Sequence, residues 1–439
     1  MRRGNHWLGA GQFRVLAALA AVGALAACSA APPGRVAGWR RDIAFVAAEL
    51  PRVHVDGLTG VSRPTWESAA ARLEAQVPHL SNGQVILGIR RVVALLRDDE
   101  THVNLPPAAV YPLALEWVGG GLCLVAVPSW DRRLLGARLL AVDGHPTGQI
   151  LAELRPDIPY QDPGVLAAAE SDEVIEANVL HWLGVASSPR SADFTVRTVA
   201  GMTVTVRLAA GQAETQPWAA RALGAASGLS AYFPRQRWLL TAFGSANLVH
   251  VPLPLFEQNL MDPYWMRVLP GGVVYLKYNE CLDTGGFGGL AARTLALLRS
   301  HPAYRLIVDL RNNPGGDTEP FGTLVDGIRA DPAINKPGRI IALVNPLTDS
   351  SATLDAANLA RSTQAILIGQ VPEDPIDEYG NDTGTLTLPY GGITITYTTK
   401  VVNPSKATLA SPDVVVAPSL QQILTGRDPV LQAALAPPP

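Results

Sequence analysis

The sequence predicts an α/β protein built around a largely parallel sheet. From residue 271 onward, continuous apolar runs alternate with helical segments, which is typical of parallel strands covered by helices on both faces. A hydrophobic content of 48% is enough for a sizeable core, and 439 residues are enough for several domains. We therefore expect a parallel α/β core in the second half of the chain and other units before it.

Residues 35–105 are expected to be helical, because apolar residues recur there at helical spacing. One helix is predicted to begin at Ser81, since Ser81-Asn-Gly-Gln84 is a capping-box pattern. Residues 110–210 have the short apolar runs and turns of a β-rich unit. In it, the alternation over 201–208 predicts a half-buried strand and Asp143-Gly144 predicts a turn.

The core elements follow in a regular order. Strands are expected at four apolar runs: 273–278, 305–310, 339–344 and 365–369. Helices are expected at 286–300, at 319–330 and after a double serine at 350 and 351. This β-α-β order predicts that the carboxyl ends of the strands share one edge of the sheet.

The N-terminus has the pattern of a targeting segment. Arginines precede an apolar run over 15–27, whose thirteen residues are too few to span a bilayer but suit a secretory signal. The run ends in Leu25-Ala-Ala-Cys28, which resembles the lipobox of bacterial lipoproteins, where the cysteine is acylated. We expect an exported protein tethered to a membrane through Cys28, in the cell envelope. An ordinary signal peptide with a chance cysteine is the alternative.

Charge and cysteine content exclude some functions. The net charge is −3 and no long run of like charges occurs, so a nucleic-acid partner is not expected. No Cys/His spacing indicates a zinc site, and we expect neither a metal nor a cofactor. Cys123 and Cys281 could pair in an exported compartment or could simply be buried thiols.

The double serine is the strongest candidate for chemistry. Ser350 and Ser351 stand between a strand and a helix, where α/β folds place ligands and where the first amides of a helix are free. The loop Pro314-Gly-Gly316 follows the preceding core strand, and its amides could complete an oxyanion hole for a reaction on Ser350. The alternative is that the serine only caps the helix and that the glycines only make a turn.

The arrangement of these motifs resembles the tail-specific (C-terminal processing) serine proteases. The most specific match is Val308-Asp-Leu-Arg-Asn-Asn-Pro-Gly-Gly316 followed by Thr348-Asp-Ser-Ser-Ala352. Weaker matches fall in the family's order: 95–102, the PDZ-like stretch 136–144, 366–369, 411–415 and 426–431. The resemblance implies a ClpP/crotonase-like core of repeated β-β-α units, an N-terminal helical domain and a PDZ-like β-rich segment.

Site roles follow from the resemblance. It implies Ser350 as the nucleophile and the amides of Gly316 and Ser351 as the oxyanion hole. Asp309, Arg311 and Gly315 would form the supporting loop.

One departure concerns the base. The best-known members activate the serine with a lysine, but Pro375 stands at that position, and none of the four lysines of the chain matches it. A serine without a base is a poor nucleophile. Tricorn-like relatives use a histidine from the helical region, which implies His102 as the general base. The third member stays open, and Asp355 is expected at the surface.

These observations predict a division of the chain and a function. The expected units are a signal peptide (1–28), a tether and helical domain (29–108), a PDZ-like segment (109–215), a connector (216–265) and a catalytic core (266–439). The expected function is a lipid-anchored serine peptidase whose partners are peptide or protein substrates. The alternative is an inactive protein that binds a peptide or small ligand in the same cleft.

Overall fold

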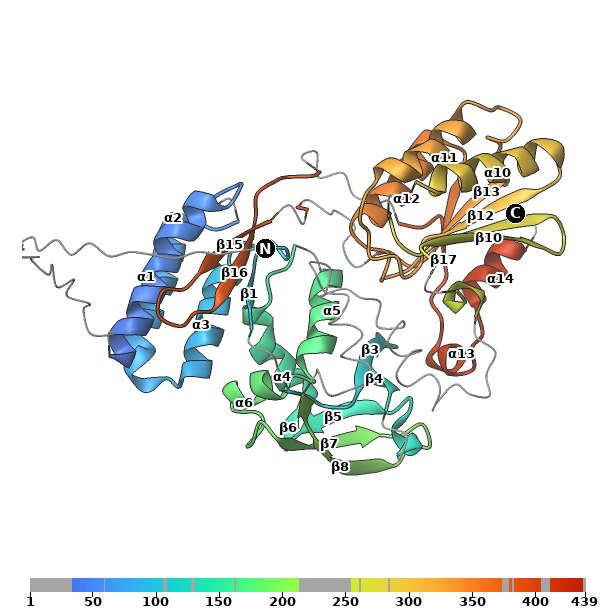
Figure 1. Cartoon of the computed structure of the whole chain (residues 1–439). Coiled ribbons are helices and arrows are strands. Elements are labelled where there is room, and N and C mark those ends of the chain that lie inside the picture. Colours follow the sequence, from blue (N-terminus) through green and yellow to red (C-terminus); the bar gives the residue numbers. More distant parts are fainter. Residues whose placement is uncertain are drawn as a thin grey trace, which may run out of the picture.

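The structure is a computed structural model (Figure 1). It describes residues 34–58, 60–105, 109–127, 131–161, 163–212, 254–259, 262–282, 285–372, 379–380, 383–403 and 411–436. The expected signal peptide with Cys28, and most of the expected connector 216–265, lie outside these residues. Within the described ranges, no helix combines the length and the apolar character that crossing a bilayer requires.

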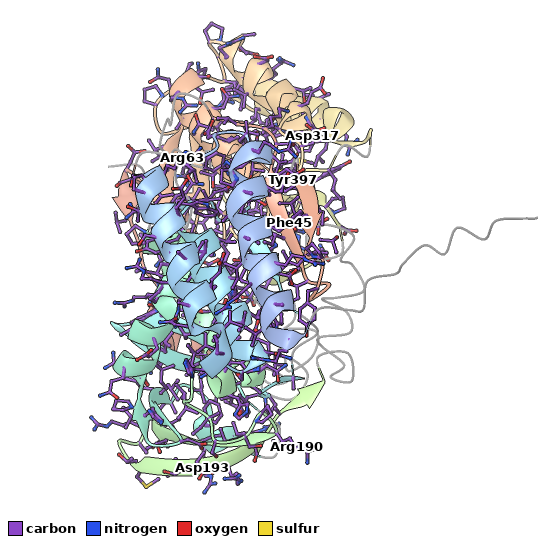
Figure 2. All side chains as sticks on the ribbon, turned by 90° about the vertical axis from the view of Figure 1, so that its left-hand side faces the viewer. Phe45, Arg63, Arg190, Asp193, Asp317 and Tyr397 are labelled. Carbon is purple, nitrogen blue, oxygen red and sulfur yellow. The ribbon has the colours of Figure 1, made fainter. Side chains whose placement is uncertain are left out.

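The first part of the chain forms a helical unit of α1 (Arg35–Val53), α2 (Arg63–Gln76) and α3 (Asn82–Ala94). The capping box predicted at Ser81 is confirmed, since Ser81 and Gln84 exchange side-chain and backbone hydrogen bonds. The three helices bury a common apolar cluster that includes Leu50, Trp66 and Ile89. Figure 2 shows α1 and α2 side by side on this face of the molecule.

A small sheet completes the helical unit. It contains β1 (His102–Asn104), β16 (Thr394–Thr398) and β15 (Thr383–Thr387), in that order. Ile395 of β16 is fully buried among the side chains of the N-terminal helices. Residues 383–398, which the expected division places in the catalytic core, therefore pack on the helical unit.

The PDZ-like segment is a mixed unit around an antiparallel sheet of β3 (Ala114–Val118), β4 (Gly121–Ala126), β5 (Arg138–Val142), β7 (Ser191–Arg197) and β8 (Thr203–Ala209). Its helices are α4 (Thr147–Leu154), α5 (Pro163–Glu173) and α6 (Ala177–Trp182). The predicted turn at Asp143-Gly144 is confirmed, because both residues have positive φ, 44° and 82°, between β5 and β6 (His145–Pro146). A short ladder of β2 (Ala109–Val110) and β9 (Gly211–Gln212) closes the unit.

The core is a six-stranded sheet with the predicted parallel order. Its strands are β10 (Tyr264–Leu269), β11 (Val273–Tyr278), β12 (Arg305–Asp309), β13 (Ile340–Val344), β14 (Ile366–Gly369) and β17 (Val414–Val415). Only the β10–β11 pair is antiparallel.

Helices cover both faces of this sheet. One face packs on α10 (Phe287–Ser300), α11 (Glu319–Arg329) and α12 (Ser351–Ser362). The other packs on α14 (Pro429–Leu435), which follows α13 (Leu420–Leu424). The loops after β12, β13 and β14 leave the sheet at the same edge because these strands are parallel. In Figure 2, Asp317 of the loop after β12 lies at the opposite end of the molecule from Arg190 and Asp193 of the PDZ-like segment.

Candidate active site

Ser350 has a strained backbone at the turn between β13 and α12. Its φ is 52° and its ψ is −128°, and its side chain makes no capping hydrogen bond. Ser62, Ser81 and Ser419 also precede helices, but each has φ near −70° and accepts a bond from an amide of its helix. Ser350 is therefore not a helix cap of the ordinary kind. Nucleophilic serines on sharp strand-to-helix turns have strained backbone conformations of this kind.

The glycine loop lies directly against this turn. Gly315 has φ 91°, and a Cβ atom there would lie 2.6 Å from the Cβ of Ser350 and 2.8 Å from the amide nitrogen of Ser351. Gly316 has φ 132°, and a Cβ atom there would lie 2.2 Å from the carbonyl oxygen of Cys281. Only glycine fits both positions, because a side chain at Gly315 would collide with the serine turn and one at Gly316 would collide with the Cys281 backbone.

Two backbone donors flank Ser350. Within the described part of the chain, the amides of Gly316 and Ser351 donate to no acceptor. The Ser351 hydroxyl donates to the Gly316 carbonyl at 2.7 Å and so links the two segments. The helix that begins at Ser351 adds a positive dipole end. Free amides beside a nucleophile are what an oxyanion hole requires, and this agrees with the predicted roles.

Asparagines connect the glycine loop to the serine turn. The carbonyl of Asn313 accepts from the Asp349 amide at 2.9 Å, and its side-chain oxygen accepts from the Gly315 amide at 2.9 Å. The Asn345 side chain donates to Asn312 Oδ1 at 2.7 Å and accepts from the Asn312 amide at 3.0 Å. The sequence analysis did not assign these residues, although two asparagines before Pro-Gly-Gly were a visible turn signal.

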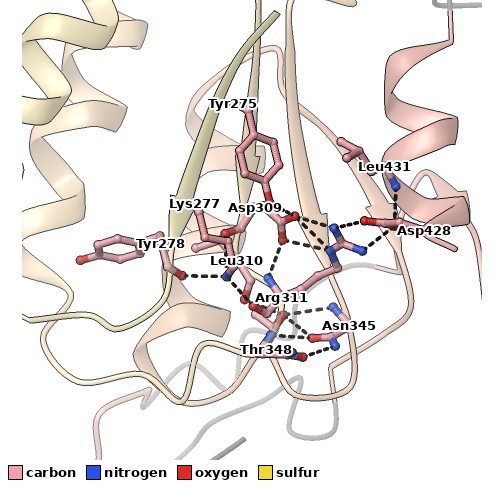
Figure 3. A network of polar contacts seen from close by, with 11 residues as sticks. Tyr275, Lys277, Tyr278, Asp309, Leu310, Arg311, Asn345, Thr348, Asp428 and Leu431 are labelled. Carbon is pink, nitrogen blue, oxygen red and sulfur yellow. Dashed lines mark hydrogen bonds and ion pairs between the residues drawn. The ribbon is translucent and has the colours of Figure 1, made fainter. Parts of the chain in front are cut away.

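Asp309 and Arg311 form a buried network under the loop (Figure 3). The Arg311 guanidinium donates to the Asp309 carboxylate. It also donates two hydrogen bonds, of 2.8 and 2.9 Å, to Asp428, the residue that precedes α14. Tyr275 donates its hydroxyl to Asp309 at 2.7 Å. Burial opposes ionisation of Asp309, but Arg311 outweighs this effect and lowers the pKa of the carboxyl. These contacts support the expectation that the pair holds the loop.

Lys277 is completely buried in β11. Its ammonium donates to the carbonyl oxygens of Arg311 at 2.6 Å, Asp309 at 3.3 Å and Tyr278 at 3.4 Å. It therefore binds the underside of the loop, and its donors are directed at backbone acceptors rather than at Ser350. A lysine inside a continuous apolar strand was the sequence signal for this role.

Asp355 is buried, so the expectation that it lies at the surface is wrong. It is 2% exposed and accepts a hydrogen bond from the Cys281 thiol at 3.5 Å. Burial raises the pKa of Asp355 well above its usual value. Cys281 and Cys123 are both free thiols, so they do not form a disulfide.

His102 lies in β1 of the helical unit, opposite Thr396 of β16. Burial, partly offset by backbone groups of Asp99 and Glu100, lowers the pKa of its imidazole. The Ser350 hydroxyl has no hydrogen bond to any described residue. The structure thus brings together Ser350, the predicted nucleophile, and its two candidate donors, and His102 stays a prediction as the base.

The loop that leads to His102 is firmly held. Asp98 is fully buried and accepts from His54 at 2.8 Å, from Thr101 at 2.5 Å and from Thr398 at 2.7 Å.

The described residues contain no cluster of side chains that could hold a metal ion.

Comparison with known proteins identifies the fold. No protein-family model matches the chain, and no curated protein matches it. Among solved structures, mature CPAF matches with a TM-score of 0.56 at 15% identity, over 89% of this chain and 94% of the CPAF chain. The chain has the fold of CPAF. CPAF complexed with lactacystin matches with a TM-score of 0.58 at 15% identity, over 91% of this chain and 97% of that one. Because the match to CPAF covers most of both chains, the helical unit, the PDZ-like segment and the core are parts of one shared architecture.

Proposed function

We propose that the chain is a serine peptidase of the tail-specific protease family, acting on proteins or unstructured peptides. The observation that supports this most directly is the strained Ser350, held between the free amides of Gly316 and Ser351. Backbone strain costs free energy and persists where the surrounding structure enforces it, most often at functional sites. The motif order along the sequence supports the same family.

In the proposed mechanism, Ser350 Oγ attacks the carbonyl carbon of the scissile peptide bond while His102 accepts its proton. The negative charge on the carbonyl oxygen is stabilised by the amides of Gly316 and Ser351, each worth about 3 kcal/mol in comparable sites. The intermediate collapses to an acyl-enzyme, and the leaving amine takes the proton from His102. Water, deprotonated by His102, then releases the acyl group and restores the serine.

The lowered pKa of His102 suits this role. It keeps the imidazole neutral at pH 7, which is the form that accepts a proton. The proposal requires the ring to come within hydrogen-bond reach of Ser350 Oγ when substrate is bound. Catalytic hydrogen bonds are often longer or absent without substrate, so their absence here is compatible with that requirement.

We also propose that the enzyme is exported and anchored in the cell envelope through acylated Cys28. The support is the charged start, the apolar run and the lipobox-like end of the first 28 residues. A Cys28→Ser variant should move from the detergent phase to the aqueous phase on phase partition. Equal partition of the variant and the parent would refute the anchor and leave the peptidase proposal unaffected.

The peptidase is tested by labelling with a fluorophosphonate probe and by cleavage of an unfolded protein. The parent should be labelled and cleave, Ser350→Ala should do neither, and Ser362→Ala in the last turn of α12 should match the parent. Labelling that persists in Ser350→Ala would refute the assignment of the nucleophile. A parent that binds unfolded peptides but is neither labelled nor active between pH 5 and 9 would instead support an inactive binding protein.

A further inference from the structure

A cavity of about 530 Å³ lies at the edge of the core sheet where the serine turn begins. Pro346 and Leu347 line it from the loop after β13, and Val371 lines it from the segment after β14. Trp117 of the PDZ-like segment contributes another wall and is 39% exposed, which is unusual for so large an apolar side chain. The cavity is therefore largely apolar and is built from more than one unit.

The cavity is close to the nucleophile. Three peptide units separate Leu347 from Ser350, so their Cα atoms lie no more than about 11 Å apart. An extended substrate advances about 3.3 Å per residue. A substrate side chain within about three residues of the scissile bond could therefore reach the cavity.

One carboxylate in the wall, Glu257, has no hydrogen-bonded or ion-paired partner among the described residues, although Arg311 and Arg427 also line the cavity. The donors of Arg311 are directed at Asp309 and Asp428. Its guanidinium lies over the Phe256 ring at 4.0 Å and is already offset by two carboxylates. A cation entering the cavity would thus meet an unpaired acceptor.

The electrostatic surroundings of Glu257 agree with this reading. Burial raises the pKa of its carboxyl to about 7, with Glu116 and Asp428 acting in the same direction and Arg311 against it. A cationic ligand beside it would favour ionisation and lower this pKa.

We propose that this cavity is a specificity pocket for a substrate side chain with an apolar stem and a cationic end, lysine or arginine. The proposal rests on the proposed peptidase function, because it assigns a substrate class to the same site. The apolar wall of Trp117, Leu347 and Val371 buries the methylene stem, and Glu257 pairs with the charged end.

Matched quenched-fluorescence peptides test the pocket. They carry lysine or norleucine, which has a similar stem and no charge, at one position scanned through three residues on each side of the scissile bond. At pH 8, kcat/KM of the parent should favour lysine by at least about tenfold at one position. Glu257→Gln should bring this ratio close to one, and Glu319→Gln, which alters an exposed carboxylate of α11, should keep it. A ratio near one in the parent at every position, or a ratio unchanged by Glu257→Gln, would overturn the pocket.

A binding experiment separates this proposal from the peptidase proposal. Fluorescence anisotropy on the Ser350→Ala protein compares the same lysine and norleucine peptides, labelled and uncleaved. A tenfold tighter Kd for lysine that disappears with the added Glu257→Gln substitution supports the pocket, even if the parent cleaves nothing. Equal Kd values for the two peptides refute it, even if the parent is an active peptidase.

Discussion

Replacing Ser350 by glycine and by alanine separates backbone strain from chemistry. Both variants lose the hydroxyl and should lose peptidase activity. Alanine keeps the Cβ atom and therefore keeps the unfavourable conformation at φ 52° and ψ −128°. Glycine adopts positive φ without a steric cost, so the two variants should differ in stability.

The size of the difference follows from two opposing terms. A non-glycine residue in such a conformation costs on the order of 1–3 kcal/mol. Glycine loses about 0.5–1 kcal/mol relative to alanine because its unfolded chain is more flexible. The glycine variant should therefore be more stable by about 1–2 kcal/mol, which raises the Tm of a unit of this size by about 2–8 °C.

Differential scanning calorimetry measures this shift, and Ser362 provides the control. Ser362 is in the last turn of α12, and its hydroxyl donates to Asn358. There glycine should be less stable than alanine, because glycine weakens a helix by about 1 kcal/mol. Opposite signs at Ser350 and Ser362 support the strain. A Ser350→Gly protein that is less stable than Ser350→Ala, with Ser362 behaving as described, would show that the serine turn is relaxed.

Three further variants test the surroundings of the site. Gly315→Ala should reduce kcat/KM at least about 100-fold in a folded protein, because a displacement of about 1 Å at the reacting groups has that effect. Gly322→Ala is the control and should keep the activity of the parent, because open space surrounds Gly322. Parent activity in a folded Gly315→Ala would disprove the close packing. Asp98→Asn should lower the free energy of unfolding by about 3 kcal/mol, because Asp98 is buried and accepts three side-chain hydrogen bonds. A urea unfolding curve identical to that of the parent would contradict this. Burial, with Glu173 beside it, raises the pKa of the Glu176 carboxyl from 4.5 to about 8. Between these pH values the folded state holds a proton that the unfolded state has lost. The free energy of unfolding should therefore fall as the pH rises from 4.5 to about 8 and should level off above about pH 8. Glu176→Gln should flatten this slope in Tm measured from pH 5 to 9, and an unchanged slope would exclude Glu176 as its source.

The sequence was informative where local pattern and tertiary structure agree. The strands β11 to β14 lie within a residue or two of the predicted runs, because buried parallel strands are continuous apolar segments bounded by turn residues. The capping box at Ser81 was also predictable, since its signal is confined to four residues. The main support for Ser350 as the nucleophile comes from its φ and ψ angles, which cannot be predicted from a sequence pattern.

Other features depend on contacts between distant segments. Residues 383–398 lie between the core strands β14 and β17 in the chain, and their pairing with His102–Asn104 and the burial of Ile395 among the N-terminal helices show that they belong to the helical unit. Asp355 was expected at the surface because a carboxylate is rarely buried, but it is buried and accepts a hydrogen bond from the Cys281 thiol, which is distant in sequence. Neither relation could be read from spacing along the chain.

The same non-local pairing bears on the proposed base. The proposed nucleophile and its proposed oxyanion donors lie in the core, whereas His102 belongs to the helical unit. Beyond β14 the chain leaves the core and forms β15 and β16, and β16 pairs with the strand that carries His102, residue Thr396 lying opposite it. The chain that follows core strand β14 thus forms the β15–β16 hairpin, which pairs with β1, the strand that carries the proposed base. Lys277 donates to backbone carbonyls beneath the loop, which argues against it as the base, whereas this hairpin pairs with the strand that carries His102, the proposed base.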